Sequence, residues 1–289
     1  MRERPLLATL LLLWGCAASP QPGAQPAADS VAQVAQPGVQ AFVEAQRARR
    51  VGLKDFASRG SAEVHWTDEH GTHHEQTQLD LAWREGGGRL ALRMDKLGER
   101  FAWSGADPES WWVFRLESKP TSLLIGRRDD PLPEDMLSFL GPDCLLELLG
   151  VSVWPDAATL EASAADGVWI RWNRSRPSGA WRATRARVPR PGGLPAEVQL
   201  LAADGSVLVK AEHARPLSVE VAGAPPGAWP EVAGTTRFTL PGRQDGSWEV
   251  FWDAPGTRPE RLKDRLFDLA VLREVLHPDQ VRDLRSESR

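Results

Sequence analysis

The chain has 289 residues, of which 42% are hydrophobic and 26% are charged, so it can bury one sizeable core. A formal net charge of -4 excludes a general attraction to nucleic acid, which selects basic surfaces. The 13 tryptophans beside 0 tyrosines suit a thick sheet or an apolar cavity, and equally a codon bias toward Trp, Arg, Ala and Gly.

The N-terminus has the pattern of an export signal. Arg2 and Arg4 precede an apolar run over residues 6–14, which is too short to span a bilayer. The run ends in Leu-Trp-Gly-Cys, which resembles a bacterial lipobox. We predict a signal peptide over residues 1–15 and lipidation of Cys16. The alternative is an ordinary secretory signal with an incidental cysteine.

Lipidation of Cys16 has consequences for the mature protein. Cys144 is left as the only free thiol, so no internal disulfide is expected. Ala17 and Ala18 follow the lipidation site, without the aspartate that retains enteric lipoproteins at the inner membrane. We therefore expect a lipid-anchored protein of the cell envelope, at the outer membrane and facing the periplasm.

Residues 16–36 are expected to form a flexible tether. This segment is rich in Ala, Pro and Gln and holds too little apolar surface to offset its ordering entropy. Pro37 is well placed to start a helix, and an apolar stripe that includes Phe42 and Val43 continues it to about Val51.

Short strands with alternating apolar residues follow the helix. We predict strands over residues 61–66, 77–83, 90–94, 101–103, 111–116 and 122–126. The turns between consecutive strands are short and rich in Gly, Asp and Pro, which favours an antiparallel meander. The alternation places ten apolar residues on one sheet face: Val64, Trp66, Leu79, Leu81, Trp83, Leu90, Leu92, Met94, Phe101 and Trp103.

The middle of the chain contains an apolar helical insertion. Residues 134–140 and 143–149 predict two short helices on either side of Gly141-Pro142, with Asp143 as the cap of the second. Because these segments are too apolar for a surface loop, they must cover a core or a pocket. Met136, Phe139 and Leu140 are the side chains that we expect to cover the sheet face.

The second half returns to strands and ends in a helix. Strands are predicted over residues 168–172, 181–188, 196–201, 207–213, 217–221, 238–240 and 248–252. A final helix is predicted over residues 259–276, followed by a frayed charged tail over residues 279–289. Residues 37–278 therefore form a single, mainly β (α+β) domain with a helix at each end and a helical insertion.

Four of the 6 histidines lie between Glu63 and Glu75. Imidazole and carboxylate groups can bind zinc, but position 78 is Gln where a zincin motif needs its second histidine. The cluster is placed at a hairpin tip, where polar residues are expected. We interpret it as a solvated turn, with a metal site as the alternative, and predict no metal and no cofactor.

No catalytic motif is present, so we predict that the chain is not an enzyme. Arginines 182, 185, 187 and 190 are interpreted as a solvated strand face, and the alternative is binding of an anion such as a phospholipid head group. Cys144 lies among leucines and is interpreted as an inert core thiol.

The pattern as a whole resembles the LolA/LolB superfamily, the periplasmic lipoprotein carrier and its outer-membrane receptor. The resemblance covers roughly residues 40–221 and rests on five segments: Gly60–Trp66, Arg89–Arg93, Phe101–Trp103, Ser110–Phe114 and Gly193–Gly205. It implies an open, curved antiparallel sheet, or half-barrel, that wraps an apolar cavity with a helical lid. A lipobox is more similar to the receptor than to the soluble carrier.

The resemblance implies binding of an acyl chain or a lipoprotein, in the context of lipoprotein sorting to the outer membrane, and we expect a lipid-anchored monomer. The ligand cavity would be lined by the ten sheet residues together with Met136, Phe139 and Leu140. The alternative is a scaffolding envelope lipoprotein whose sheet is fully packed and holds no small ligand. An enzyme is the least favoured class.

Overall fold

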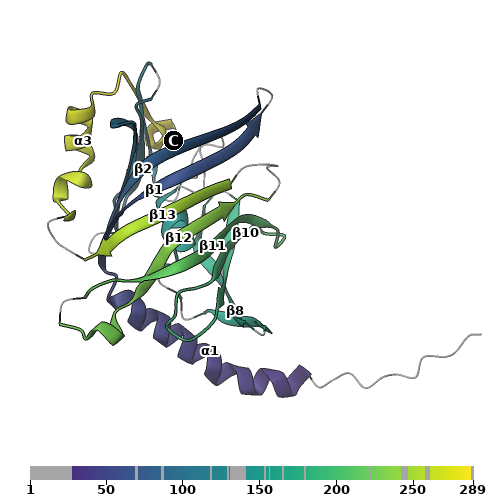
Figure 1. Cartoon of the computed structure of the whole chain (residues 1–289). Helices are drawn as coiled ribbons and strands as arrows, with labels where there is room; N and C mark the ends of the chain where they lie inside the picture. Colours follow the sequence, from purple (N-terminus) through teal and green to yellow (C-terminus); the bar gives the residue numbers. More distant parts are fainter. Residues whose placement is uncertain are drawn as a thin grey trace, which may run out of the picture.

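A computed structural model describes residues 28–68, 71–85, 88–117, 119–128, 130, 141–152, 154–155, 157–164, 166–178, 180–221, 223–241, 247–257 and 261–287. Within these ranges one sheet contains all the strands, in the order β14-β6-β5-β4-β3-β2-β1-β13-β12-β11-β10-β9-β8-β7. Neighbouring strands are antiparallel except β14 and β6, which are parallel. The edge strands β14 and β7 do not pair with each other, so the curved sheet stays open (Figure 1).

Several strands alternate apolar and polar residues as the sequence predicts, whereas β5 is buried on both faces. Their bounds are β1 Asp55–Asp68, β2 Gly71–Arg84, β3 Arg89–Lys96, β4 Glu99–Ala106, β5 Ser110–Arg115, β6 Ser122–Arg127, β7 Thr159–Ala164, β8 Gly167–Ser178, β9 Trp181–Val188, β10 Glu197–Leu201, β11 Val207–Ser218, β12 Glu231–Thr239, β13 Ser247–Gly256 and β14 Gln280–Asp283. The predicted fold class, an open antiparallel sheet with few helices, is confirmed.

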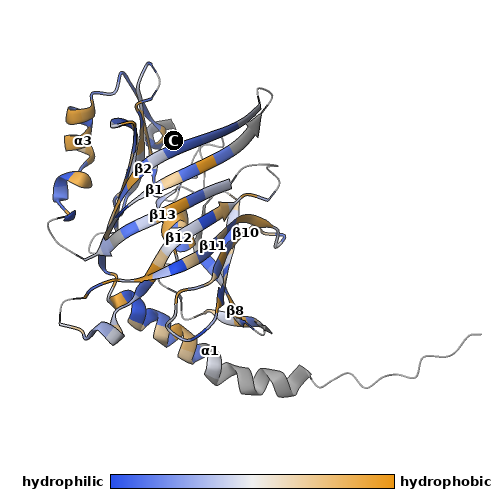
Figure 2. Cartoon of the chain, in the orientation of Figure 1, coloured by the Kyte–Doolittle hydropathy of each residue, from blue (hydrophilic) through white to orange (hydrophobic). Residues whose placement is uncertain are grey.

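Helices lie against both faces of the sheet. Their bounds are α1 Ala28–Val51, α2 Pro142–Leu148, η2 Pro226–Ala228, η4 Asp264–Leu266, α3 Leu269–Leu276 and α4 Leu284–Glu287. We call the face that α2 covers the inner face; it contains Leu81, Leu92 and Val113. The outer face contains Trp112 and Phe114 and is covered there by α3, which is largely apolar (Figure 2).

The first helix is longer than predicted. It begins at Ala28 rather than at Pro37, so it takes in the last part of the segment that was expected to be a tether. Val43 is buried against the apolar side chains of β8 and β9, which ties the second half of the helix to the sheet. The predicted signal peptide and Cys16 lie outside the described residues. No helix in the described ranges is long and apolar enough to cross a membrane.

The C-terminal region differs from the prediction in two places. The helix expected over residues 259–276 is divided into η4 and α3, because the Asp268 carboxylate accepts hydrogen bonds from the amides of Ala270 and Val271 and so starts a new helix. The expected frayed tail forms β14 and α4 instead. Asp279 accepts hydrogen bonds from the backbone amide and the hydroxyl of Thr121, at 2.8 and 2.9 Å, and holds this segment to the sheet.

Two strands predicted over residues 207–213 and 217–221 form the single strand β11. Arg215 has a left-handed φ of 51° and interrupts the predicted alternation without ending the strand. The neighbouring Gly234 permits this, because a Cβ atom there would lie 2.5 Å from the Arg215 carbonyl oxygen. The strands β7 and β14 were not predicted.

Candidate functional site

The inner face of β2 and β3 carries the predicted apolar residues. Leu79, Leu81 and Trp83 lie directly opposite Met94, Leu92 and Leu90, and all six are buried in one cluster. Val64 lies on the same face of β1, opposite Trp248 of β13, which packs against that cluster. Trp66 lies on β1, but its side chain is outside the described part of the chain.

The prediction for Trp103 is wrong. The pairing of β3 with β4 shifts between Met94 and Asp95, so Phe101 packs with the inner cluster whereas Trp103 lies opposite Arg93 on the outer face. A bulge of this kind changes the face of every residue beyond it, and strict alternation cannot detect it. Met136, Phe139 and Leu140, the expected cover of the face, lie outside the described residues.

The helix α2 covers the inner face with leucines. Leu145, Leu146, Leu148 and Leu149 are all buried in the inner cluster. The helix starts at Pro142 with Gly141 as its N-cap, so the predicted cap at Asp143 is wrong. The Asp143 carboxylate instead forms ion pairs with Arg128, at 2.6 Å, and with Arg174, at 3.0 Å.

The other end of α2 is held by a half-buried histidine. The two ring nitrogens of His213 each lie 2.7 Å from a carbonyl oxygen, one of Leu148 and one of Pro195. Burial lowers the pKa of His213, although both carbonyls favour the protonated ring. Arg49 donates to the carbonyl of Gly150 at 2.7 Å, and burial lowers its pKa to about 10 against the opposing charge of Glu231.

Glu147 places a carboxyl group in the interior beneath the helix. Its carboxylate accepts a hydrogen bond of 2.8 Å from the Trp172 indole. Burial nevertheless raises the pKa of Glu147, because few water molecules can stabilise its charge there. On the same helix, burial raises the pKa of the Cys144 thiol to about 12, which agrees with an inert cysteine.

Three polar atoms on the inner face have no protein partner. Trp83 Nε1, Ser104 Oγ and Thr236 Oγ1 are buried and make no hydrogen bond within the described structure. Ser104 lies between Leu92 and Val113, and Thr236 lies opposite Val250, so all three atoms face the apolar interior. An unsatisfied buried polar group costs about 1–3 kcal/mol, and such groups in proteins usually contact a water molecule or a ligand.

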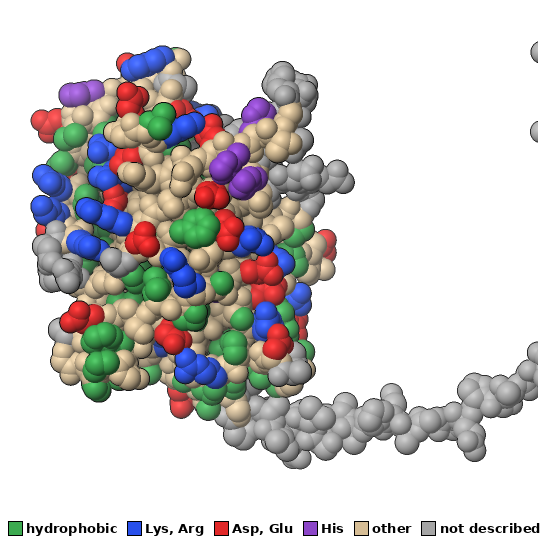
Figure 3. Space-filling view, in the orientation of Figure 1, with side chains coloured by type: hydrophobic (Ala, Val, Ile, Leu, Met, Phe, Trp, Pro, Cys, Tyr) green, Lys and Arg blue, Asp and Glu red, His purple; other side chains and the backbone are tan. Residues whose placement is uncertain are grey.

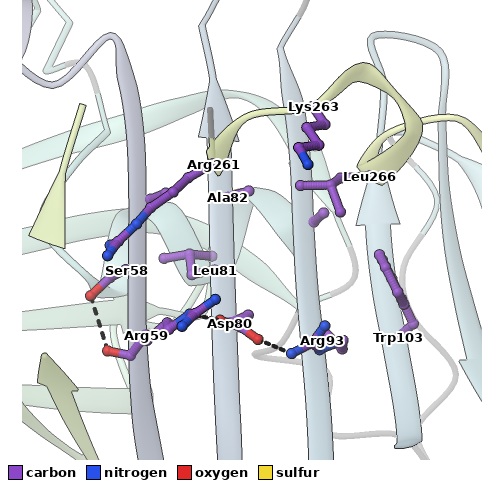
Figure 4. A pocket seen from close by; sticks show the side chains of 12 residues that line it. Ser58, Arg59, Asp80, Leu81, Ala82, Arg93, Trp103, Arg261, Lys263 and Leu266 are labelled. Carbon is purple, nitrogen blue, oxygen red and sulfur yellow. Dashed lines mark hydrogen bonds and ion pairs between the residues drawn. The ribbon is translucent and has the colours of Figure 1, made fainter. Parts of the chain in front are cut away.

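A cavity of about 230 Å³ lies on the opposite, outer face (Figure 4). It is enclosed by β1 to β4 and by residues 261–266, whose Leu262 is buried against alanines of the sheet. Its lining includes four cations and one carboxylate: Arg59, Arg93, Arg261, Lys263 and Asp80. Arg59 and Arg93 both form ion pairs with Asp80, so the cavity combines charged and apolar side chains and differs from the apolar cavity that was predicted.

Three of the four arginines of β9 and the loop that follows it are paired with carboxylates, and Arg182 donates to the carbonyl of Trp181. Arg185 contacts Glu161, Arg187 contacts Asp166, and Arg190 contacts Glu231 at 3.0 Å. Their charges are therefore largely compensated, as expected for a solvated strand face rather than for an anion site.

No protein-family model and no curated protein matches the chain. Among solved structures, a LolA superfamily protein from Nitrosomonas europaea is similar, with a TM-score of 0.56 at 11% identity, over 80% of this chain and 97% of that one. A DUF1329 family protein from Desulfovibrio piger has a TM-score of 0.54 at 12% identity, over 80% of this chain and 99% of that one.

A domain assigned to outer membrane lipoprotein sorting, from Vibrio parahaemolyticus, has a TM-score of 0.53 at 11% identity, over 82% of this chain and 98% of that one. Each of these structures is covered almost completely by the chain, and the identities are too low to show more than the fold. The chain therefore has a LolA/LolB-like fold.

Proposed function

We propose that this chain is an envelope protein that binds the acyl chain of a lipid or lipoprotein against the inner face, beneath α2. The observation that carries the proposal is the set of buried polar atoms without a protein partner, at Trp83, Ser104 and Thr236, on a mainly apolar face. An acyl chain with a polar ester or amide end provides both an apolar body and acceptors for such groups. The LolA/LolB-like fold supports the same proposal.

The expected affinity follows from apolar burial. Each buried CH₂ group stabilises by about 0.8 kcal/mol, so ten methylenes give about 8 kcal/mol, which corresponds to a dissociation constant of about 1 μM. The leucines of α2 already cover part of the face, and Asp143 and His213 hold the two ends of this helix. The acyl chain therefore enters beside α2 or displaces it.

Quenching of tryptophan fluorescence by brominated fatty acids tests the proposal, because bromine quenches only indoles that it contacts. We expect saturable quenching, reduced in Trp83→Phe because that indole lies on the inner face. Trp112→Phe is the matched control, since Trp112 is also buried but lies on the outer face under α3. Equal quenching in both variants would place the ligand elsewhere.

The second candidate is the scaffolding lipoprotein with a packed sheet. It is favoured by the burial of the inner residues within the protein itself, as at Leu90, which is 0% exposed, and Leu92, which is 3% exposed. Under this alternative the folded protein shows no saturable quenching with any chain length. Both candidates propose binding or support, not catalysis.

Anchoring at Cys16 belongs to the same proposal and is tested separately. Cys16→Ser should leave the protein unprocessed or move it from the membrane to the soluble fraction. Mass spectrometry of the purified protein should show a diacylglycerol only on the unmutated chain. Identical mass and equal membrane retention of the two proteins would contradict anchoring without affecting the acyl-binding proposal.

A further inference from the structure

The hairpin of β1 and β2 aligns residues that the sequence placed in a turn. The two strands pair without a break from Asp55 opposite Arg84 to Asp68 opposite Gly71. This register places His65 directly opposite His74, which lies on a strand rather than in the predicted turn. Glu63 precedes His65 by two positions and so lies on the same face. Figure 3 shows histidine side chains gathered beside acidic ones in this region.

The three side chains are close enough to share one ion. The rings of His65 and His74 are stacked, with centroids 4.3 Å apart and planes 9° from parallel. Their Nε2 atoms lie 3.9 and 3.8 Å from Oε2 of Glu63. All three ligand atoms lie within 4.8 Å of one another.

We propose that Glu63, His65 and His74 form a binding site for a divalent first-row transition cation, of which Zn²⁺ is the probe. Two imidazoles and a carboxylate are a ligand set that such ions accept in proteins. Zinc bonds of about 2.0–2.2 Å place tetrahedral ligand atoms about 3.4 Å apart. The two Nε2 atoms and the Glu63 oxygen must therefore move closer together. The shortening needed ranges from a few tenths of an ångström for the closer pairs to about 1.4 Å for the widest pair. The remaining coordination positions are open to water.

The side chains are free to make this movement. They are 35–55% exposed, so rotation about χ1 and χ2 meets little packing. The lone pair of each Nε2 lies in its ring plane, and parallel rings cannot direct both lone pairs at one point. The ion must therefore turn the rings out of their stack, and the strand pairing keeps their Cβ atoms in place meanwhile.

The residues opposite Glu63 on the neighbouring strands do not neutralise its negative charge, so the carboxylate is available to bind an ion. Glu249, which lies opposite Glu63 on β13, is already paired with Arg237 at 3.2 Å. The other neighbours across the strands are neutral, Gln76 opposite Glu63 and Ser247 opposite His65. Within the described structure Glu63 makes no hydrogen bond, because both imidazoles lie beyond hydrogen-bond distance.

His73 provides the matched control. It is adjacent to His74 in sequence but lies opposite Trp66, so alternation directs it to the other face of the hairpin. A site made by the strand register needs His74 and not His73, whereas a site in a loose, histidine-rich turn would use either residue.

The test is a calorimetric titration of ZnCl₂ into the full chain, produced without a histidine tag and stripped with a chelator. We expect one zinc ion per chain, with affinity lowered at least about tenfold by His65→Ala, by His74→Ala and by Glu63→Gln, and unchanged in His73→Ala. Circular dichroism and thermal unfolding without metal show that the variants are folded. The imidazole signals of His65 and His74 should shift in NMR spectra as zinc is added.

Three outcomes would overturn the proposal. The first is the absence of saturable binding by the folded protein. The second is binding that survives the double variant His65→Ala/His74→Ala. The third is an equal loss in His73→Ala and His74→Ala, which would assign the ion to the turn. None of these outcomes bears on acyl binding at the inner face, which lies on the other side of the sheet.

Discussion

We expect the same substitution, Thr→Val, to change the free energy of unfolding in opposite directions at two buried threonines of the inner face. Thr236 is 0% exposed and its hydroxyl has no partner, whereas the hydroxyl of Thr77 donates to the Asp95 carbonyl at 2.9 Å. In the ligand-free protein we expect Thr236→Val to be neutral or stabilising by up to about 1 kcal/mol and Thr77→Val to destabilise by about 1 kcal/mol. Denaturant unfolding measures both. An equal loss would mean that the Thr236 hydroxyl is satisfied.

His213 predicts a pH dependence of stability. Burial lowers its pKa below the ordinary value of 6.5, so the unfolded chain takes up a proton before the folded protein does. The contribution of this residue to stability is complete above pH 6.5 and is lost as the pH falls from 6.5 toward the lowered pKa, by up to about 1.4 kcal/mol per pH unit.

Unfolding free energies of the wild-type protein and of His213→Gln, measured across this pH range, check the prediction. The variant cannot titrate at this position, so the difference between the two proteins should change as the pH falls below 6.5 and stay constant above it. The raised pKa of Glu147 affects both proteins alike and cancels in the difference. A constant difference at all pH values would contradict the assignment.

At the scale of single strands, two glycines allow tryptophans to lie flat on the sheet. A Cβ atom at Gly126 would lie 2.3 Å from the Trp111 ring, and one at Gly105 would lie 2.5 Å from the Trp112 ring. Both tryptophans are almost completely buried, at 1% and 0% exposure, so neither ring can move aside. Packing of each tryptophan ring against the glycine opposite it stabilises the pairing of β5 with β4 and with β6.

We expect Gly126→Ala to destabilise the protein by about 1–3 kcal/mol, because the extra methyl group overpacks a rigid contact. Gly256→Ala is the control, since nothing lies within 4 Å of the position that its Cβ atom would take. The midpoint of guanidinium unfolding should fall in the first variant and stay nearly constant in the second. A similar shift in both would mean that strand conformation, not the ring contact, determines the effect.

Most strands were predictable because one face of each is buried. Trp181–Val188 has the predicted bounds, although the buried side of the strand changes between Ala183 and Thr184, which are both buried. The errors occur where a local feature interrupts the regular spacing of apolar residues. These features are the register shift after Met94, the left-handed conformation of Arg215 and the helix cap at Asp268. Alternation carries no information on these, because each depends on a contact with a distant strand or on the local backbone conformation.

The sequence favoured a solvated turn over a metal site at the histidine cluster for a related reason. Its residues were recognised, but they were assigned to a turn and not paired. The pairing of Asp68 with Gly71 belongs to the same register that places His65 opposite His74. This step needs only the sequence once the register is known. The outer cavity had no such signal, since residues 261–266 come from the far end of the chain.

At the scale of the whole molecule, an open sheet has two edges, and exposed edges promote association. The tail shields one of them: β14 adds a parallel strand to β6, and Asp279 fastens it through Thr121. Leu284 of α4 packs against the inner cluster. The segment that the sequence predicted to fray therefore protects the edge of the sheet.

Deletion of residues 279–289 should consequently expose the β6 edge, with loss of stability and formation of dimers or larger species in size-exclusion chromatography. Asp279→Ala removes only the two hydrogen bonds that this carboxylate accepts from Thr121, so we expect a lower free energy of unfolding than in the wild-type protein. Ser286→Ala, in the exposed last helix, should change stability by less than about 0.5 kcal/mol. A truncated protein that stays monomeric and as stable as the full chain would show that β14 does not protect the sheet in solution.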